Sequence, residues 1–138
     1  MSTRPTFRAG GNIALKVPLY RYEATLAFYR DALGLPYLGS AGESHVFQYG
    51  PLRLWLDPVA HQSQVDVWLE VVTPDLAAGT AHLAAAGVPV RDELEPLGDL
   101  AGHWISDPAG VVLLLTTGDA GDDERARGGD GGTAAGSA

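Results

Sequence analysis

The sequence predicts an α+β fold in which two βαβββ modules repeat along the chain and share one curved mixed sheet. Two stretches indicate this: one runs from Asn12 to Pro36, and a weaker copy runs from Val65 to Pro89. Each begins with an apolar strand and continues into a helix that ends at a glycine, the residue typical of a left-handed helix cap. Pairing the two modules places the helices outside and leaves a concave cavity, the natural place for a ligand.

The first module is expected to span residues 11–58. Apolar and polar residues alternate from Asn12 to Val17 with the period of a half-buried strand, and a helix follows from about Tyr22 to Leu33. The remaining strands are expected at residues 37–38, 45–49 and 52–57. The last two read as a hairpin around Gly50-Pro51.

The second module is expected to span residues 65–117 and to repeat this order. An apolar strand over 65–72 precedes an alanine-rich helix over 76–86, for which Thr73 or Asp75 is the expected cap. Further strands are expected at residues 88–90, 102–106 and 111–117. The turn before the last strand, Asp107-Pro108-Ala109-Gly110, has the residue preferences of a type I turn.

The two ends of the chain differ in composition from the modules. Residues 1–10 are polar and are expected to form a flexible lead-in. Residues 118–138 form an acidic, Gly/Ala-rich tail without large apolar side chains, and they are expected to be disordered because they bury too little surface to offset the cost of ordering.

Charge and composition narrow the classes of function. The formal net charge of −8 over 138 residues argues against nucleic acid and against an acidic membrane surface as partners. The absence of cysteine excludes disulfides, thiolate nucleophiles and cysteine-bound zinc. No stretch reads as a membrane span or a signal peptide, so the expected location is the cytoplasm.

Four segments resemble the vicinal oxygen chelate superfamily, which includes glyoxalase I, the extradiol dioxygenases and the bleomycin-resistance proteins. They are residues 13–17, 28–35 (FYRDALGL), 83–87 and the turn 107–110. The resemblance covers roughly residues 12–117 and implies the glyoxalase/bleomycin-resistance fold. It implies little about activity, because this fold supports many chemistries.

In the metal-using members of that superfamily, His or Glu side chains on the first and last strands of each module hold a divalent ion. The matching positions here are Asn12 or Ala14, Val67 or Trp68, residues 53–56, and the neighbourhood of Leu114. None of these positions carries His or Glu in any register, so no metal cofactor is expected. The alternative is a zinc, nickel, iron or manganese site with shifted ligands.

Six residues are the candidates for ligand binding, whereas no catalytic residue is assigned. On the strand over 52–57, alternation puts Arg53, Trp55 and Asp57 on one face, a combination that suits a cavity or a dimer face better than a helix-packed core. Glu70 interrupts an apolar strand, and His103 is the best candidate for a pocket acid or base. The tryptophans could form an aromatic wall or pack in the core. The six candidates are Asn12, Arg53, Trp55, Glu70, His103 and Trp104.

Three functions remain open from the sequence. The leading hypothesis is a metal-free protein that binds a small organic molecule in the concave cavity, as bleomycin-resistance proteins do. The alternatives are a metal-dependent glyoxalase-type lyase, isomerase or dioxygenase, and a structural or regulatory dimer with a filled cavity. The resemblance also implies a homodimer as the expected assembly.

Overall fold

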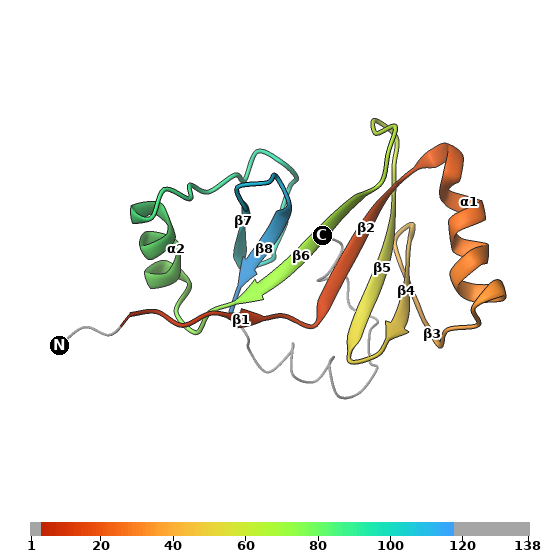
Figure 1. The fold of residues 1–138 in the computed structure, drawn as a ribbon, viewed down its shortest axis with the longest axis horizontal. Coiled ribbons are helices and arrows are strands. Elements are labelled where there is room, and N and C mark those ends of the chain that lie inside the picture. The colour runs from red at the N-terminus through yellow and green to blue at the C-terminus, as the bar shows by residue number, and fades with distance from the viewer. Residues whose placement is uncertain (1–3, 118–138) are drawn as a thin grey trace.

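Two modules lie side by side on one curved sheet in the computed structural model, which describes residues 4–117 (Figure 1). The first module contains β2 (Asn12–Pro18), α1 (Leu19–Ala27), the π-helical turn η1 (Phe28–Ala32), β3 (Tyr37–Ala41), β4 (Ser44–Tyr49) and β5 (Leu52–Val59). The second contains β6 (Asp66–Val72), α2 (Leu76–Ala85), β7 (Gly102–Ser106) and β8 (Val112–Thr116). A short strand, β1 (Arg8–Ala9), precedes them.

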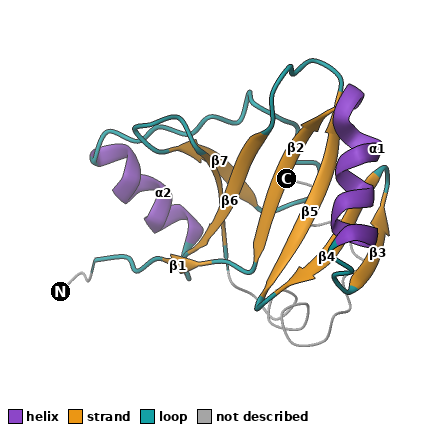
Figure 2. Cartoon of the chain, turned by 45° about the vertical axis from the view of Figure 1, so that its right-hand side comes forward, coloured by secondary structure: helices purple, strands orange, loops and turns teal. Residues whose placement is uncertain are grey.

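The strand order shows the repeat directly. Within the described residues the sheet runs β3-β4-β5-β2-β6-β8-β7, and β1 pairs with β6. The first strand of each module lies parallel to the last strand of the same module, β2 to β5 and β6 to β8. The two modules of one chain join where β2 and β6 run antiparallel in the middle of the sheet (Figure 2). The predicted α+β fold of two modules on a curved mixed sheet is confirmed.

One expected strand is absent from the described residues. Residues 88–90, predicted to be a strand, belong instead to an irregular segment between α2 and β7. Pro89 has no N–H to donate, and the N–H of Val88 bonds to the carbonyl of Leu83 at the end of α2 (2.8 Å). We call residues 91–100 the cover loop. Three leucines of this loop, Leu94, Leu97 and Leu100, pack against the sheet.

The cover loop also forms hydrogen bonds with the backbone of Trp104, in the middle of the edge strand β7. The N–H of Trp104 donates to Oδ1 of Asp92 (2.9 Å), and its carbonyl accepts from the N–H of Arg91 (2.6 Å). At Trp104 the loop thus takes the pairing position that a counterpart of β3 would occupy in the second module.

The two faces of the sheet carry separate apolar clusters. On the outer face, Tyr22 and Leu26 of α1 pack on a cluster that includes Phe47, Leu54 and Leu56. On the opposite face, which we call the inner face, the buried cluster consists of Ala14, Val46, Trp55, Trp68, Trp104, Val112 and Leu114. All three tryptophans thus lie on the face away from α1.

Local signals in the sequence mark the ends of several elements correctly. Gly34 closes the first helical segment with φ of 66°, and Asp75 caps α2 by accepting from the N–H of Ala78 (3.1 Å). In the turn before β8, Asp107 Oδ1 accepts from the N–H groups of Ala109 and Val111, each at 2.9 Å. These contacts join residues that are close together in the sequence, which is why residue preferences predict them.

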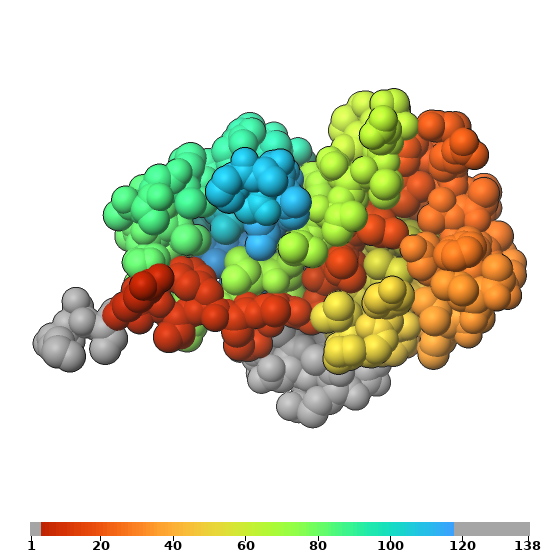
Figure 3. All heavy atoms as spheres, viewed as in Figure 1, coloured from red at the N-terminus to blue at the C-terminus, as the bar shows by residue number. Residues whose placement is uncertain are grey.

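The first residues of the described chain pack against the second module. Arg8 and Ala9 pair with Val72 and Val71, and the hydroxyl of Thr73 donates to the carbonyl of Thr6 (2.8 Å). The space-filling view shows this segment in red below the second module (Figure 3). The tail expected at residues 118–138 lies outside the described residues.

Candidate functional site

Side chains on the inner face of the four central strands form three levels. The strand register places Asn12 beside Arg53, Ala14 beside Trp55 and Trp68, and Lys16 beside Asp57 and Asp66. We call these the polar, apolar and charged levels. Glu70 belongs to the polar level because it bonds to Asn12, and Val112 belongs to the apolar level because it pairs with Trp68.

The polar level is ordered by a chain of hydrogen bonds through Asn12. The indole Nε1–H of Trp55 donates to Oδ1 of Asn12 (2.8 Å), and Nδ2 of Asn12 donates to Oε1 of Glu70 (3.1 Å). The backbone N–H of Asn12 also points at this carboxylate oxygen (3.3 Å). Arg53 is 3% exposed. Four of the six candidates, Asn12, Arg53, Trp55 and Glu70, thus meet in one part of the inner face.

Gly10 leaves the space that the Glu70 side chain occupies. A Cβ atom added at Gly10 would overlap the carboxylate and the Cγ atom of Glu70. We expect Gly10→Ala to lower the free energy of unfolding by about 1–3 kcal/mol, the usual cost of overpacking. Urea denaturation measures it. In a Glu70→Ala background the same substitution should cost far less, and an equal cost in both backgrounds would contradict this explanation.

The apolar level is closely packed. Trp55 and Trp104 are 0% and 1% exposed, and the rings of Trp68 and Trp104 meet edge to face with centroids 4.9 Å apart. The Nε1–H of Trp104 donates to the backbone carbonyl of Glu95 in the cover loop (2.8 Å). Trp68 is also buried, and its Nε1–H has no hydrogen-bond acceptor within residues 4–117. The structure thus shows the three tryptophans packed in the inner core, and their role as an aromatic wall for a ligand stays a prediction.

The charged level is a buried ionic cluster centred on Lys16. Its Nζ lies 2.9 Å from Oδ2 of Asp57, 3.0 Å from Oε1 of Glu95 and 4.3 Å from the centre of the Trp68 ring. The hydroxyl of Ser44 donates to the other oxygen of Asp57 (2.6 Å). Lys16 and Asp57 are both buried. Burial raises the pKa of Asp57 above its ordinary value, although the Lys16 charge and the Ser44 hydrogen bond oppose that rise.

The raised pKa of Asp57 predicts a pH dependence of stability with a definite sign. Between the ordinary pKa and the raised one, the folded state binds more protons than the unfolded state, so this group contributes less stability as the pH rises. We expect the unfolding free energy of the wild type, minus that of Asp57→Asn, to fall as the pH rises through this window. Denaturation at a series of pH values measures it, and a rise would contradict it.

His103 lies apart from the other candidates. It neighbours Trp104 on β7, so its side chain points to the opposite face of the sheet, and its Nδ1 lies 2.7 Å from Oδ2 of Asp92. The structure therefore brings together Asn12, Arg53, Trp55 and Glu70, places Trp104 in the same inner cluster, and separates His103 from them.

No residue of the charged level is among the six sequence candidates; the level consists of Lys16, Ser44, Asp57, Asp66 and Glu95. A signal for Lys16 is visible in the alternation of β2, which puts it on the face of Asn12 and Ala14. Its pairing with Asp57 depends on the β2–β5 register. Glu95 lies 79 positions from Lys16, and no local pattern connects them.

The inner face does not fit a metal ion. Among residues 4–117, no three His, Cys, Asp or Glu side chains come together as ligands. The carboxylates on this face are engaged otherwise, Asp57 by Lys16 and Ser44, and Glu70 by Asn12. The apolar level, Ala14, Trp55, Trp68 and Val112, offers no coordinating oxygen or imidazole.

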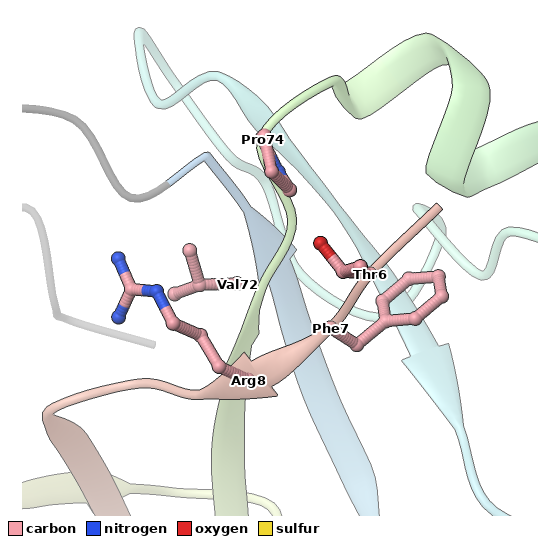
Figure 4. Close-up of a pocket in the computed structure, with 5 residues that line it drawn as sticks. All are labelled: Thr6, Phe7, Arg8, Val72 and Pro74. Carbon is pink, nitrogen blue, oxygen red and sulfur yellow. The ribbon is translucent and has the colours of Figure 1, made fainter. Parts of the chain in front are cut away.

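A surface pocket also lies outside the inner face. It has a volume of about 300 Å³ and lies where β1 meets the end of β6, lined by Thr6, Phe7, Arg8, Val72 and Pro74 (Figure 4). None of the six candidates lines it. The inner face therefore remains the candidate site.

Comparison with solved structures shows which known proteins share this fold. No protein-family model and no curated protein matches the sequence. Among solved structures, the Mn(II)-bound glyoxalase from Novosphingobium aromaticivorans is similar over 82% of this chain and 40% of its own, with 20% identity and a TM-score of 0.60. Methylmalonyl-CoA epimerase from Mycobacterium tuberculosis is similar over 85% and 92%, with 16% identity and a TM-score of 0.57.

A glyoxalase/bleomycin resistance protein/dioxygenase superfamily member from Vibrio splendidus is similar over 80% of this chain and 97% of its own, with 16% identity and a TM-score of 0.51. This chain thus spans less than half of the first of these structures and nearly all of the other two. The chain has the vicinal oxygen chelate fold, and the resemblance drawn from its motifs to that superfamily is confirmed at the level of the fold. Within the described residues, no helix is both long and apolar enough to cross a membrane.

Proposed function

We propose that this chain is a cytoplasmic, metal-free protein that binds a small organic molecule on the inner face of its sheet. The ordered polar level carries the proposal. Burying an arginine and holding a carboxylate beside an asparagine costs desolvation free energy. A sheet face that served only as a packed core would carry apolar side chains at these positions instead. Beside an aromatic wall, the arginine and the carboxylate supply the few convergent polar groups that small-molecule sites use.

Exposure indicates where the ligand makes its first contacts. Asn12 and Glu70 are partly exposed, whereas Trp55 and Trp104 are buried beneath neighbouring side chains and the cover loop. The ligand therefore meets the polar level directly. It reaches the tryptophans by displacing the leucines of the cover loop that pack on them.

The proposal is tested by titrating the full chain with a panel of small aromatic and aliphatic compounds of each charge type. Tryptophan fluorescence and thermal stability report binding, since the three tryptophans line the same face. Glu70→Gln should weaken binding about tenfold, the effect of losing one hydrogen bond to a charged group. Glu23→Gln is the matched control, because Glu23 is an exposed acid on α1.

Two results would count against this function. One is a panel in which no compound changes the fluorescence or the thermal midpoint. The other is equal binding by Glu70→Gln and Glu23→Gln, which would separate binding from the polar level.

The expected homodimer is a second part of the proposal, supported by apolar side chains left exposed on the outer face. Val65, Val67 and Leu69 on and beside β6 are 53%, 41% and 37% exposed. Beside them, a groove of about 500 Å³ runs between β2 and α1, lined in part by Leu15 and Tyr20. Apolar surface of this kind marks protein contacts.

Light scattering after gel filtration tests the assembly. The wild type should have twice the mass of the chain, and Val67→Lys should shift it toward the monomer. Tyr49→Lys, at a residue exposed to a similar degree at the end of β4, is the matched control and should remain dimeric. A monomeric wild type would remove this part of the proposal.

A further inference from the structure

A short piece of the cover loop lies on the inner face in the manner of a bound ligand. The segment Leu94-Glu95-Pro96-Leu97 carries one carboxylate between two leucines. Leu94 and Leu97 pack on the tryptophan cluster, and the Glu95 carboxylate reaches Nζ of Lys16 at 3.0 Å. The first module offers no counterpart, because β3 stays in the sheet at the corresponding place.

The ammonium group of Lys16 is held in a fixed position in which it can bind a carboxylate. Its side chain is 3% exposed, and its ammonium group lies between Asp57 and the face of the Trp68 ring. Asp57 is held from the other side by Ser44 and cannot turn away without losing that bond. Nζ has three protons to donate: one points to Asp57, and the bond to Glu95 uses another.

The two contacts of Lys16 differ in their burial. The side chain of Asp57 is 7% exposed, whereas that of Glu95 is 29% exposed and sits on a loop. A partly solvated carboxylate on a loop is the easier one to replace, because water can take over its hydrogen bonds as it leaves. The Trp68 Nε1–H, buried without an acceptor within the described residues, is a second donor near this anchor.

We propose that the inner face binds an apolar carboxylate, whose carboxylate group takes the place of Glu95 on Lys16. The ring or chain of the ligand takes the place of Leu94 and Leu97 against Trp68 and Trp104. The proposal rests on the proposed function and names the chemical class of its ligand. Glu95 then acts as an internal competitor that keeps the anchor paired when no ligand is bound.

Calorimetric titration of the full chain with 1-naphthoate and its neutral isostere 1-naphthamide tests this proposal. Glu95→Gln removes the competing charge but keeps the backbone carbonyl that accepts from Trp104. The ratio of naphthoate affinity to naphthamide affinity should rise about tenfold or more in this variant, the scale of one charge-assisted hydrogen bond. Lys16→Gln, checked for folding by circular dichroism, should bring the ratio close to one.

Glu93→Gln is the matched control. It removes the same charge from the same loop, but its side chain is 64% exposed and pairs with Arg91 rather than with Lys16. Its affinity ratio should stay within about twofold of the wild type, since exposed charges act weakly through solvent. If Lys16→Gln fails to fold, the comparison of the Glu95 and Glu93 variants still decides.

Three outcomes overturn the inference: an unchanged ratio in Glu95→Gln, an equal rise in Glu93→Gln, or no binding of naphthoate to any of the proteins. The proposed function is contradicted by a different result, in which no compound of the panel of small aromatic and aliphatic compounds binds to the inner face. If every protein bound naphthamide as tightly as naphthoate, the proposal of small-molecule binding would stand, but the proposal that Lys16 recognises a carboxylate would fail.

Discussion

Replacing Trp55 with alanine is expected to lower the free energy of unfolding by about 3–5 kcal/mol, the usual cost of truncating a buried large aromatic. Trp55 is 0% exposed and lies at the centre of the inner cluster, between Ala14 on β2 and Val46 on β4. The substitution also removes the donor that orients Asn12. Urea denaturation followed by circular dichroism measures the loss.

A second variant separates packing from hydrogen bonding at this position. Trp55→Phe keeps an aromatic ring but lacks the Nε1–H, so Asn12 Oδ1 loses its donor at a cost of about 1–3 kcal/mol. Tyr49→Ala, at the exposed end of β4, serves as the control and should change stability by no more than about 0.5 kcal/mol. A decrease in the free energy of unfolding of less than about 1 kcal/mol for Trp55→Ala would show that packing on the inner face contributes little to stability.

Replacing Lys16 with methionine is expected to be destabilising to a similar degree, about 3–5 kcal/mol, because it leaves the Asp57 charge buried without its cation. Lys16 and Asp57 are 2% and 5% exposed, so water cannot readily replace the missing ammonium group. Methionine retains most of the length of the lysine side chain, which keeps the packing against Trp68 comparable.

The double variant Lys16→Met/Asp57→Asn tests this cause. Asparagine keeps a partner for Ser44 but carries no charge, so the double variant should regain a large part of the loss. Additive losses in the double variant would mean that the two side chains act independently. In that case the ion pair would not account for the effect of Lys16→Met.

Much of the fold could be read from the sequence because it rests on short-range patterns. The alternation in β2 and β5 predicted which residues share a face, including the set Arg53, Trp55 and Asp57. The helix end at Gly34 and the turn at Asp107 depend on contacts within a few residues. The repeat of these signals in two halves was sufficient to predict two modules on one sheet.

The prediction of a strand at 88–90 is wrong, because tertiary contacts hold these residues in a different conformation. The three residues have a strand-like composition, but Val88 bonds back to the end of α2, and the following loop finds apolar partners on the inner face. Propensity is a weak prior that such tertiary contacts override. The same loop delivers Glu95 to Lys16, so the missed strand and the missed contact between Lys16 and Glu95 have one cause.

Alternation and helix capping act over a few residues, so they were sufficient to predict the two modules, the class of the fold and which side chains share a face. The folded chain was needed to show that Asn12 meets Glu70, that Lys16 meets both Asp57 and Glu95, and that Trp104 faces inward while His103 does not. These pairings join residues 41 to 79 positions apart, and they depend on strand register and on the path of one loop.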